Sequence, residues 1–376
     1  MLPFALKSFH IKNYKGIIDT QIDNIPDNTQ WIFLTGENGF GKTSVLQAIV
    51  EHITDWQLGS SKGGLGLLYG GKLITSISLC KGNEFMNNKQ ELRAFIIKTV
   101  AYGSTRLRVS GGVTTEVTEN FSSTSSLFSN DTVLINIEEN FKDWKNNYSQ
   151  GFEALENIFK TLLPNLSKIE VEFDENDKKS KVKYYETDLE GNKYKEGTEF
   201  LHLAAGYKNI IAMVGDMVTR LMLHQPVKEL MYLHGIVVID EIDLHLHPKY
   251  QKLFVQKLTE LFPNIQFIVS THSPIPLLGA PASSVIINVS RTREHGIKAE
   301  LLDIDFSVLT PNAILSSPIF GFQDLIPDSK SDDKMIRTED TFQEVEFNDQ
   351  LKKNINEFLT EDKQKELLDL LKIKAL

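Results

Sequence analysis

A glycine-rich segment has the residue types and spacing that bind a nucleoside triphosphate. It reads G-E-N-G-F-G-K-T from Gly36 to Thr43 and matches the phosphate-loop pattern G-x-x-x-x-G-K-[ST]. Glycines let backbone N–H groups converge on a phosphate without Cβ clashes, and the lysine brings a positive charge to the β- and γ-phosphates. The threonine hydroxyl is a ligand for Mg²⁺. The segment therefore predicts a site for ATP and Mg²⁺. The residues expected to contact ATP here are Asn38, Gly39, Gly41, Lys42, Thr43 and Ser44.

Two carboxylates follow an apolar run some 200 residues later. The run 236–239 reads I-V-V-I and ends in Asp240 and Glu241. Adjacent carboxylates at one strand end repel each other unless a cation lies near them. We expect Asp240 to hold the Mg²⁺ ion, through water, and Glu241 to act as the general base that polarises the attacking water.

A histidine follows the next apolar run. Residues 266–269 read Q-F-I-V, and the sequence continues as S-T-H-S-P from Ser270 to Pro274. A histidine at this strand end can hydrogen-bond the γ-phosphate or the attacking water. A single strand-end histidine is more often structural, but its place after the phosphate loop and the acidic pair favours a catalytic role for His272.

A mainly parallel α/β sheet is expected to position these residues. The run 31–35 is apolar or β-branched, as in a strand buried on both faces, and strands alternate with a helix from 236 to 287. In open α/β sheets, ligands bind at the carboxyl ends of the strands. We expect strands over 31–35, 168–173, 181–187, 236–239, 266–270 and 285–287, and helices over 42–52, 150–163, 207–224 and 248–261.

Composition limits the possible settings and partners. The 376 residues contain one cysteine, Cys80, and no apolar run of the roughly 18 residues that cross a bilayer. These features indicate a cytoplasmic protein without a membrane partner. The net charge of −10 argues against nucleic-acid binding by bulk electrostatics, although a local basic groove leaves nucleic acid possible as a partner.

Taken together, these motifs resemble those of the ABC-type ATPases of the SMC, RecF and OLD group. The run D-E-I-D-L-H-L-H-P at 240–248 is more typical of that group than of membrane transporters, and N-Y-K-G at 13–16 is similar to its first strand. The resemblance covers about residues 1–310. It implies a P-loop NTPase of the ABC head type with two lobes.

The resemblance also implies a signature motif, L-S-x-G, which caps the γ-phosphate bound to an opposite subunit. The matching residues are L-A-A-G at 203–206, where Ala204 replaces the usual serine. One lost hydrogen bond costs about 0.5–1.5 kcal/mol, which weakens a dimer without forbidding it. Ala205 and Gly206 are therefore expected to contact ATP from a second protomer in a homodimer or higher homo-oligomer. The alternative interpretation is simple packing at a helix start.

The expected domain organisation is an ATPase head followed by a small extension. Lobe I combines 1–100 with 229–310, and lobe II covers 101–228. A linker follows over 311–341, and a helical C-terminal extension covers 342–376. The 160 residues between the phosphate loop and the signature leave no room for coiled-coil arms. No segment after 310 is expected to form the TOPRIM nuclease of OLD enzymes, and we do not place a glutamine loop.

The resemblance implies an ATP-driven switch. We expect ATP to hold two heads together and hydrolysis to loosen them, so that the chain controls a separate effector protein, a nuclease, as in Septu-type or retron-linked phage-defence ATPases. The alternative is a RecF/SMC-like DNA-repair ATPase that binds DNA directly. A transporter subunit is disfavoured, because it would carry a serine-containing signature and a membrane partner.

Overall fold

The computed structural model describes most of residues 1–320 and few of those that follow. The described residues are 2–55, 68–69, 72–81, 84–85, 98–105, 123–174, 179–188, 190–192, 194–225, 227–309, 311–320, 350–351 and 353. Within them, no helix combines the length and the apolar character needed to cross a bilayer.

The parallel part of the main sheet is built on the strand that precedes the phosphate loop. β3 (Trp31–Thr35) lies between β11 (Ile265–Ser270) and β12 (Val285–Thr292), and both neighbours run parallel to it. β10 (Gly235–Ile239) pairs with β11 in parallel, and β7 (Thr99–Tyr102) pairs with β10 in parallel. The carboxyl ends of these strands therefore share one edge of the sheet.

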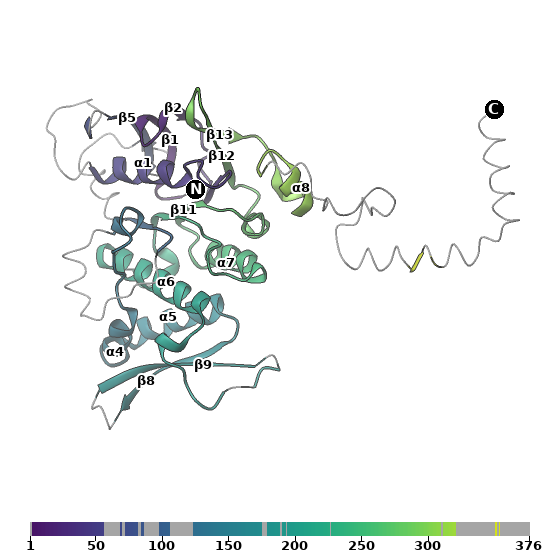
Figure 1. The fold of residues 1–376 in the computed structure, drawn as a ribbon. Helices are drawn as coiled ribbons and strands as arrows, with labels where there is room; N and C mark the ends of the chain where they lie inside the picture. The colour runs from purple at the N-terminus through teal and green to yellow at the C-terminus, as the bar shows by residue number, and fades with distance from the viewer. Residues whose placement is uncertain are drawn as a thin grey trace, which may run out of the picture.

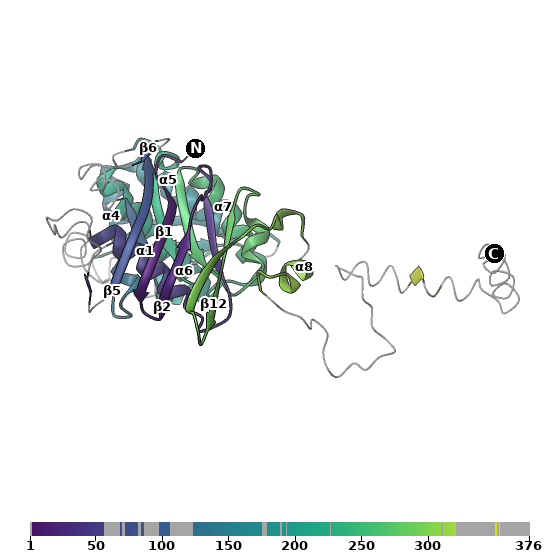
Figure 2. The ribbon, with the colours of Figure 1, turned by 90° about the horizontal axis from the view of Figure 1, so that it is seen from above.

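The other part of the sheet is antiparallel and curls over helix α1 (Lys42–Asp55) (Figures 1 and 2). Eleven strands of the described residues join into this one sheet. The antiparallel strands follow β12 in the order β13 (Gly296–Leu302), β2 (Ile17–Ile22), β1 (Ala5–Tyr14), β5 (Lys72–Lys81) and β4 (Leu68–Tyr69), and β6 (Glu84–Phe85) pairs with β5.

The parallel strands are apolar throughout because both of their faces are covered. Successive side chains of a strand point to opposite faces. In β3, Trp31 and Phe33 pack into the core on the side of the large helices, whereas Ile32 and Leu34 pack into a second core around α1. The sheet is thus layered between two cores, with α1 inside its curl (Figure 1).

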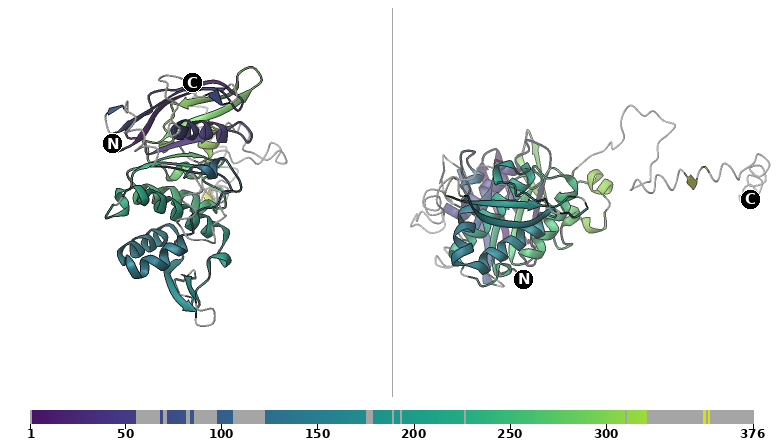
Figure 3. Two further views of the ribbon diagram at one scale, coloured as in Figure 1. Left: turned by 90° about the vertical axis from the view of Figure 1, so that its left-hand side faces the viewer. Right: turned by 90° about the horizontal axis from the view of Figure 1, so that it is seen from below.

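Helices and one hairpin lie on the side of the sheet opposite to α1 (Figure 3). These elements are α4 (Ile137–Asn147), α5 (Ser149–Leu162), β8 (Leu166–Asp174), β9 (Lys179–Glu186), α6 (Ala205–His224) and α7 (Pro248–Leu261). Short helical turns are η2 (Ser125–Leu127), η3 (Phe200–His202), η4 (Leu230–Tyr232), η5 (Pro276–Gly279), η6 (Phe306–Val308) and α8 (Pro311–Ser316).

Three segments differ from the expectations. α4 was not predicted, because its sequence is polar and only a few side chains, such as Ile137 and Phe141, face the core. Residues 101 and 102 belong to the main sheet as the end of β7. Residues 311–320, expected as the start of a linker, contain α8 and place Ile314 and Ile319 fully in the core. The remainder of the linker and nearly all of the extension over 342–376 lie outside the described residues.

Candidate functional site

The three predicted motifs meet because their strands are neighbours. β11 lies between β3 and β10, and all three are parallel. The phosphate loop follows β3, the acidic pair follows β10, and the segment containing His272 follows β11. His272 therefore lies between the phosphate loop and the acidic pair, at the edge where parallel α/β sheets bind ligands.

Lys42 lies at the centre of the phosphate loop. Its side chain is 5% exposed, and its Nζ donates to the carbonyl oxygens of Gly36 at 2.7 Å and Glu37 at 3.0 Å. Burial lowers the pKa of Lys42, while three nearby carboxylates act in the opposite direction. The ammonium group is thus held under the loop in the position expected of a phosphate-binding lysine.

One glycine of the loop faces a backbone carbonyl group, a second packs on a side chain, and a third opens outward. A Cβ on Gly36 would lie 2.1 Å from the carbonyl oxygen of Val289, and a Cβ on Gly41 would lie 2.4 Å from Ile297 Cδ1. Gly39 also has a positive φ of 79°, but a Cβ there would meet no described atom within 4 Å. The loop therefore packs on β12 and β13 at Gly36 and Gly41 and is open at Gly39. A phosphate can approach the loop from this open side.

The oxygen atoms expected to hold the metal lie together. Thr43 Oγ1 donates to Asp240 Oδ2 at 2.7 Å, and Ser270 Oγ donates to Asp240 Oδ1 at 2.5 Å. Mg²⁺ prefers hard oxygen ligands, usually one or two from the protein together with phosphate oxygens and water. A hydroxyl and a carboxylate beside a phosphate loop supply this donor set, so the residues fit the ion.

Glu241 adopts a backbone conformation that is rare for a residue with a side chain. Its φ is 51°, and its N–H donates to Ser270 Oγ at 2.8 Å. Such conformations cost about 1–3 kcal/mol and persist where the surroundings impose them, often at functional sites. Its carboxylate lies 4.0 Å from His272 Nε2 and is one-third exposed, so water can reach it.

His272 links the two halves of the site. Its Nδ1 lies 3.1 Å from Lys42 Nζ, so a neutral imidazole can accept a hydrogen bond from the ammonium group. Burial lowers the pKa of His272, the charge of Lys42 lowers it further, and nearby carboxylates such as Asp243 oppose the shift. The histidine is therefore neutral near pH 7 and can donate from Nε2 toward the side of Glu241.

This lowered pKa predicts a pH-dependent stability. The unfolded chain takes up a proton on this histidine near pH 6.5, whereas the folded chain does so only at lower pH. The contribution of neutral His272 to stability is therefore present above about pH 6.5 and is lost as the pH falls. Without nucleotide, the wild type should lose part of its advantage in melting temperature over His272→Gln as the pH is lowered from about 7.5 to about 5.5. His295→Gln is the control, because His295 is 72% exposed in the turn between β12 and β13. Parallel pH profiles for the wild type and His272→Gln would contradict the assignment.

Two further residues organise the site, although no role was predicted for them. Ser270 bridges the acidic pair by donating to Asp240 and accepting from the N–H of Glu241. Asp243 Oδ1 accepts from Thr271 Oγ1 at 2.7 Å and from the N–H of His272 at 3.4 Å. Ser270 and Asp243 both lie within the motifs quoted from the sequence. Their contacts depend on the pairing of β10 with β11, which brings the two motifs together.

The signature-like residues 205 and 206 lie at the start of α6. The atoms nearest to a Cβ on Gly206 would be those of His245 and Leu246, with the His245 carbonyl oxygen at 2.9 Å. Asn209 Nδ2 donates to the Leu244 carbonyl oxygen at 3.0 Å. The first turn of α6 therefore packs on the loop that follows the acidic pair, and Ala205 is exposed there.

The turn N-Y-K-G is a tight connection between β1 and β2 that contacts α1. Three of its residues have positive φ: Asn13 at 49°, Lys15 at 44° and Gly16 at 91°. The Tyr14 hydroxyl donates to Glu51 at 2.5 Å, and Lys15 Nζ donates to Gln47 at 2.7 Å. The turn is thus held against the helix that begins at the phosphate loop.

Comparison with known proteins shows relatives that include Septu and retron proteins. The chain is 28% identical over 352 residues to the Septu protein PtuA of Bacillus mycoides (strain KBAB4), covering 86% of this chain and 46% of that protein. It is 43% identical over 123 residues to the "Retron Vc95 probable ATPase" of Vibrio cholerae serotype O1 biovar El Tor, covering 32% of this chain and 22% of that protein. The chain thus spans less than half the length of either relative. The expected resemblance to Septu-type and retron-linked proteins is confirmed.

The chain also resembles solved structures and matches two family models. A crystal structure of an SMC head bound to the C-winged helix domain of ScpA aligns with a TM-score of 0.45 and 16% identity, covering 80% of this chain and 98% of that chain. One family model, which names the AbiEii toxin of a type IV TA system beside an AAA domain, matches residues 149–275. A second, described as an AAA domain, matches residues 8–199, more than half of the chain. The chain therefore belongs to the AAA domain family of this second model.

Proposed function

We propose that the protein is a Mg²⁺-dependent ATPase that works as a switch between separate and paired heads in the cytoplasm. One observation carries the ATPase proposal: hydrogen bonds join the three motifs at one sheet edge. Lys42 Nζ lies 3.1 Å from His272 Nδ1, and Asp240 accepts from Thr43 Oγ1 and Ser270 Oγ. Family membership and the name of the retron relative support it.

Each residue has a defined task in this proposal. The loop from Asn38 to Ser44 holds the phosphates, and the charge of Lys42 lies beneath the β- and γ-phosphates. Thr43 and Asp240 would hold Mg²⁺, which would supply positive charge to offset the charge of the phosphate oxygens. Glu241 accepts a proton from the attacking water, and neutral His272 donates a hydrogen bond to the γ-phosphate or orients that water.

The pairing of two heads is supported by the position of α6. In one protomer, the N-terminus of α6 packs on the loop 244–246, and the phosphate loop is open at Gly39. Helix N-termini bind anions through free N–H groups and the helix dipole. A second copy that faces the first can bring its Ala205 and Gly206 to this opening. The site is then completed only in a homodimer or a higher oligomer.

An exposed leucine beside the α6 N-terminus provides a test of this pairing. Leu201 lies in the turn η3, is 76% exposed, and its carbonyl oxygen accepts from Lys208 Nζ at 3.3 Å. In the Glu241→Gln background with Mg²⁺-ATP, Leu201→Asp should weaken the dimer by about ten-fold or more, because a charge would be buried in the interface. Light scattering over a range of protein concentrations measures this change.

The matched control is Leu223→Asp, at the opposite end of α6. Leu223 is 55% exposed and lies about 27 Å along the helix from its N-terminus. This variant should dimerise like the parent. Equal dimerisation by Leu201→Asp and the parent would contradict the face-to-face arrangement, and so would an equal loss in both variants.

We further propose that the paired heads control a separate effector protein, a nuclease, in phage defence. The support is the similarity to a Septu protein over 86% of the chain and the similarity to a retron ATPase. Purification of the tagged chain from a strain that carries its native neighbouring genes tests this proposal. We expect a neighbour-encoded nuclease to co-purify in an amount that depends on ATP. A chain that purifies alone with and without ATP would contradict it.

A further inference from the structure

A buried polar network interrupts the apolar core between α6 and the main sheet. Asp216, on α6, is fully buried among apolar residues such as Met213 and Met217. Its Oδ2 accepts from the Tyr102 hydroxyl at 2.8 Å, and its Oδ1 accepts from the N–H of Ile135 at 2.8 Å. Arg220 Nε donates to both carboxylate oxygens, at 3.0 and 2.9 Å.

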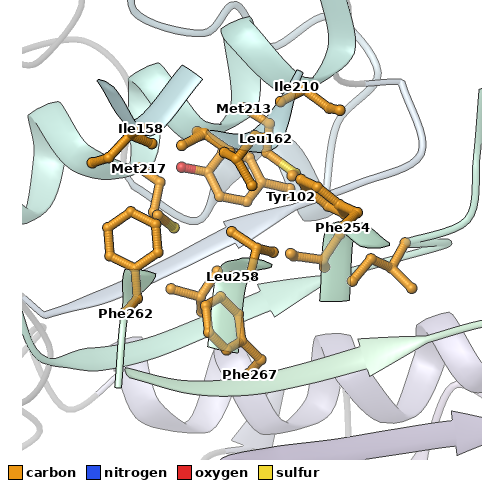
Figure 4. Packing of buried hydrophobic residues seen from close by; sticks show 14 of the residues in the cluster. Tyr102, Ile158, Leu162, Ile210, Met213, Met217, Phe254, Leu258, Phe262 and Phe267 are labelled. Carbon is orange, nitrogen blue, oxygen red and sulfur yellow. The ribbon is translucent and has the colours of Figure 1, made fainter. Parts of the chain in front are cut away.

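Such a network needs an explanation beyond stability. A buried ion pair is often no more stabilising than apolar residues of the same volume, but it requires one particular arrangement of its partners. Burial raises the pKa of Tyr102 well above its usual value, so the hydroxyl keeps its proton and remains a donor. Tyr102 is 1% exposed and belongs to the same apolar cluster as Leu162, Met213 and Met217 (Figure 4). The ring therefore has little freedom to move.

Tyr102 also contacts the proposed metal ligand through its backbone. It is the last residue of β7 and pairs with Ile239, the last residue of β10. Its carbonyl oxygen accepts from the N–H of Asp240 at 2.8 Å. The same residue thus holds the backbone of Asp240 with its carbonyl group and the helix α6 with its hydroxyl group.

We infer that Tyr102 is a positioning residue that fixes Asp240, the proposed Mg²⁺ ligand, relative to α6. This inference rests on the proposed function. α6 carries Gly206 at its start and is joined to the loop after the acidic pair by Asn209. Tyr102 supplies a second connection, seven residues further along the helix at Asp216. Together, the two connections hold the signature-like end of α6 and the metal carboxylate of the same protomer in one rigid arrangement.

The first test measures the backbone of Asp240 without any ligand. Tyr102→Phe keeps the ring and removes only the hydroxyl group. Hydrogen–deuterium exchange of the nucleotide-free protein should show faster exchange at the Asp240 amide in this variant, by about five-fold or more. The amide reports directly on its hydrogen bond to the Tyr102 carbonyl group.

The second test measures the metal site. Mn²⁺ replaces Mg²⁺ in the presence of ATP, and electron paramagnetic resonance gives the fraction of bound metal. In Tyr102→Phe, the apparent Mn²⁺ affinity should fall about five-fold or more, whereas the affinity for ATP without a divalent cation should stay within about two-fold of the wild type. A general loss of structure would lower both affinities.

Thr219→Val is the matched control, because it removes a different buried hydrogen bond from the same helix. Asn140 Nδ2 donates to Thr219 Oγ1 at 2.9 Å, and this pair joins α6 to α4 rather than to β7. The variant should melt at a lower temperature than the wild type and keep the wild-type Asp240 exchange and Mn²⁺ affinity. If Thr219→Val changes both as Tyr102→Phe does, the effect is general and the inference fails.

The remaining outcomes separate this inference from the proposed function. Equal Asp240 exchange in the wild type and Tyr102→Phe overturns the inference, whether or not ATP binds. In another outcome, the wild type binds ATP and Mn²⁺ while Tyr102→Phe keeps the same Mn²⁺ affinity. This result also overturns the inference, but it leaves the proposed function standing. A wild type that binds no nucleotide overturns the proposed function and this inference with it.

Discussion

Glu241→Gln is expected to lower ATP turnover by about 10²–10⁴-fold, the usual contribution of general acid–base catalysis, while ATP binding persists. Glutamine keeps the size of the side chain and cannot accept the proton of the attacking water. The variant also removes one negative charge near the phosphates, so the ATP-bound pair of heads should accumulate. Phosphate release measures turnover, and light scattering with Mg²⁺-ATP measures assembly.

The control for this variant is Glu260→Gln. Glu260 is an exposed residue of α7 that pairs with Lys257 on the surface, so its neutralisation removes a carboxylate far from the sheet edge that carries the site. This variant should hydrolyse ATP and assemble like the wild type. Wild-type hydrolysis by Glu241→Gln would show that another group is the base, with His272 the next candidate.

The second large effect is expected at Lys42, where replacement by alanine should weaken ATP binding by about 10- to 150-fold. A hydrogen bond to a charged group contributes about 1.5–3 kcal/mol, and each 1.4 kcal/mol corresponds to a factor of ten. The buried Nζ also holds the loop through the carbonyl oxygens of Gly36 and Glu37. Fluorescence titration with a labelled ATP analogue measures the affinity.

Lys42→Met separates the charge from the packing of the side chain. Methionine keeps an apolar stem of similar length and removes the ammonium group. We expect Lys42→Met to lose as much ATP affinity as Lys42→Ala while melting closer to the wild type. Wild-type affinity in both variants would exclude Lys42 as the phosphate-binding lysine.

The elements around the site could be predicted because their signals are local. The run I-V-V-I is apolar at every position, which identifies a strand covered on both faces, and β10 ends where the carboxylates begin. Pro248 favours the first turn of a helix, and α7 covers 248–261 as expected. The convergence of the motifs followed from the parallel arrangement of their strands, which the structure shows.

Other features could not be predicted because they depend on contacts between distant residues. The bond from Ser270 to Asp240 requires β10 and β11 to be neighbours, and the bond from Tyr102 to Asp216 joins residues 114 positions apart. α4 has too few apolar positions for its periodicity to stand out. The short helix α8 lies at the start of the segment expected as a linker, and only the burial of Ile314 shows that it packs on the core. The contacts with ATP remain predictions.

The most direct test of the central claim is a calorimetric titration of ATP into the purified wild-type protein with Mg²⁺. The arrangement of Lys42, Thr43 and Asp240 predicts saturable binding of one ATP per chain that weakens when the metal is chelated. An absence of measurable ATP binding by the folded protein, with and without Mg²⁺, would contradict the account.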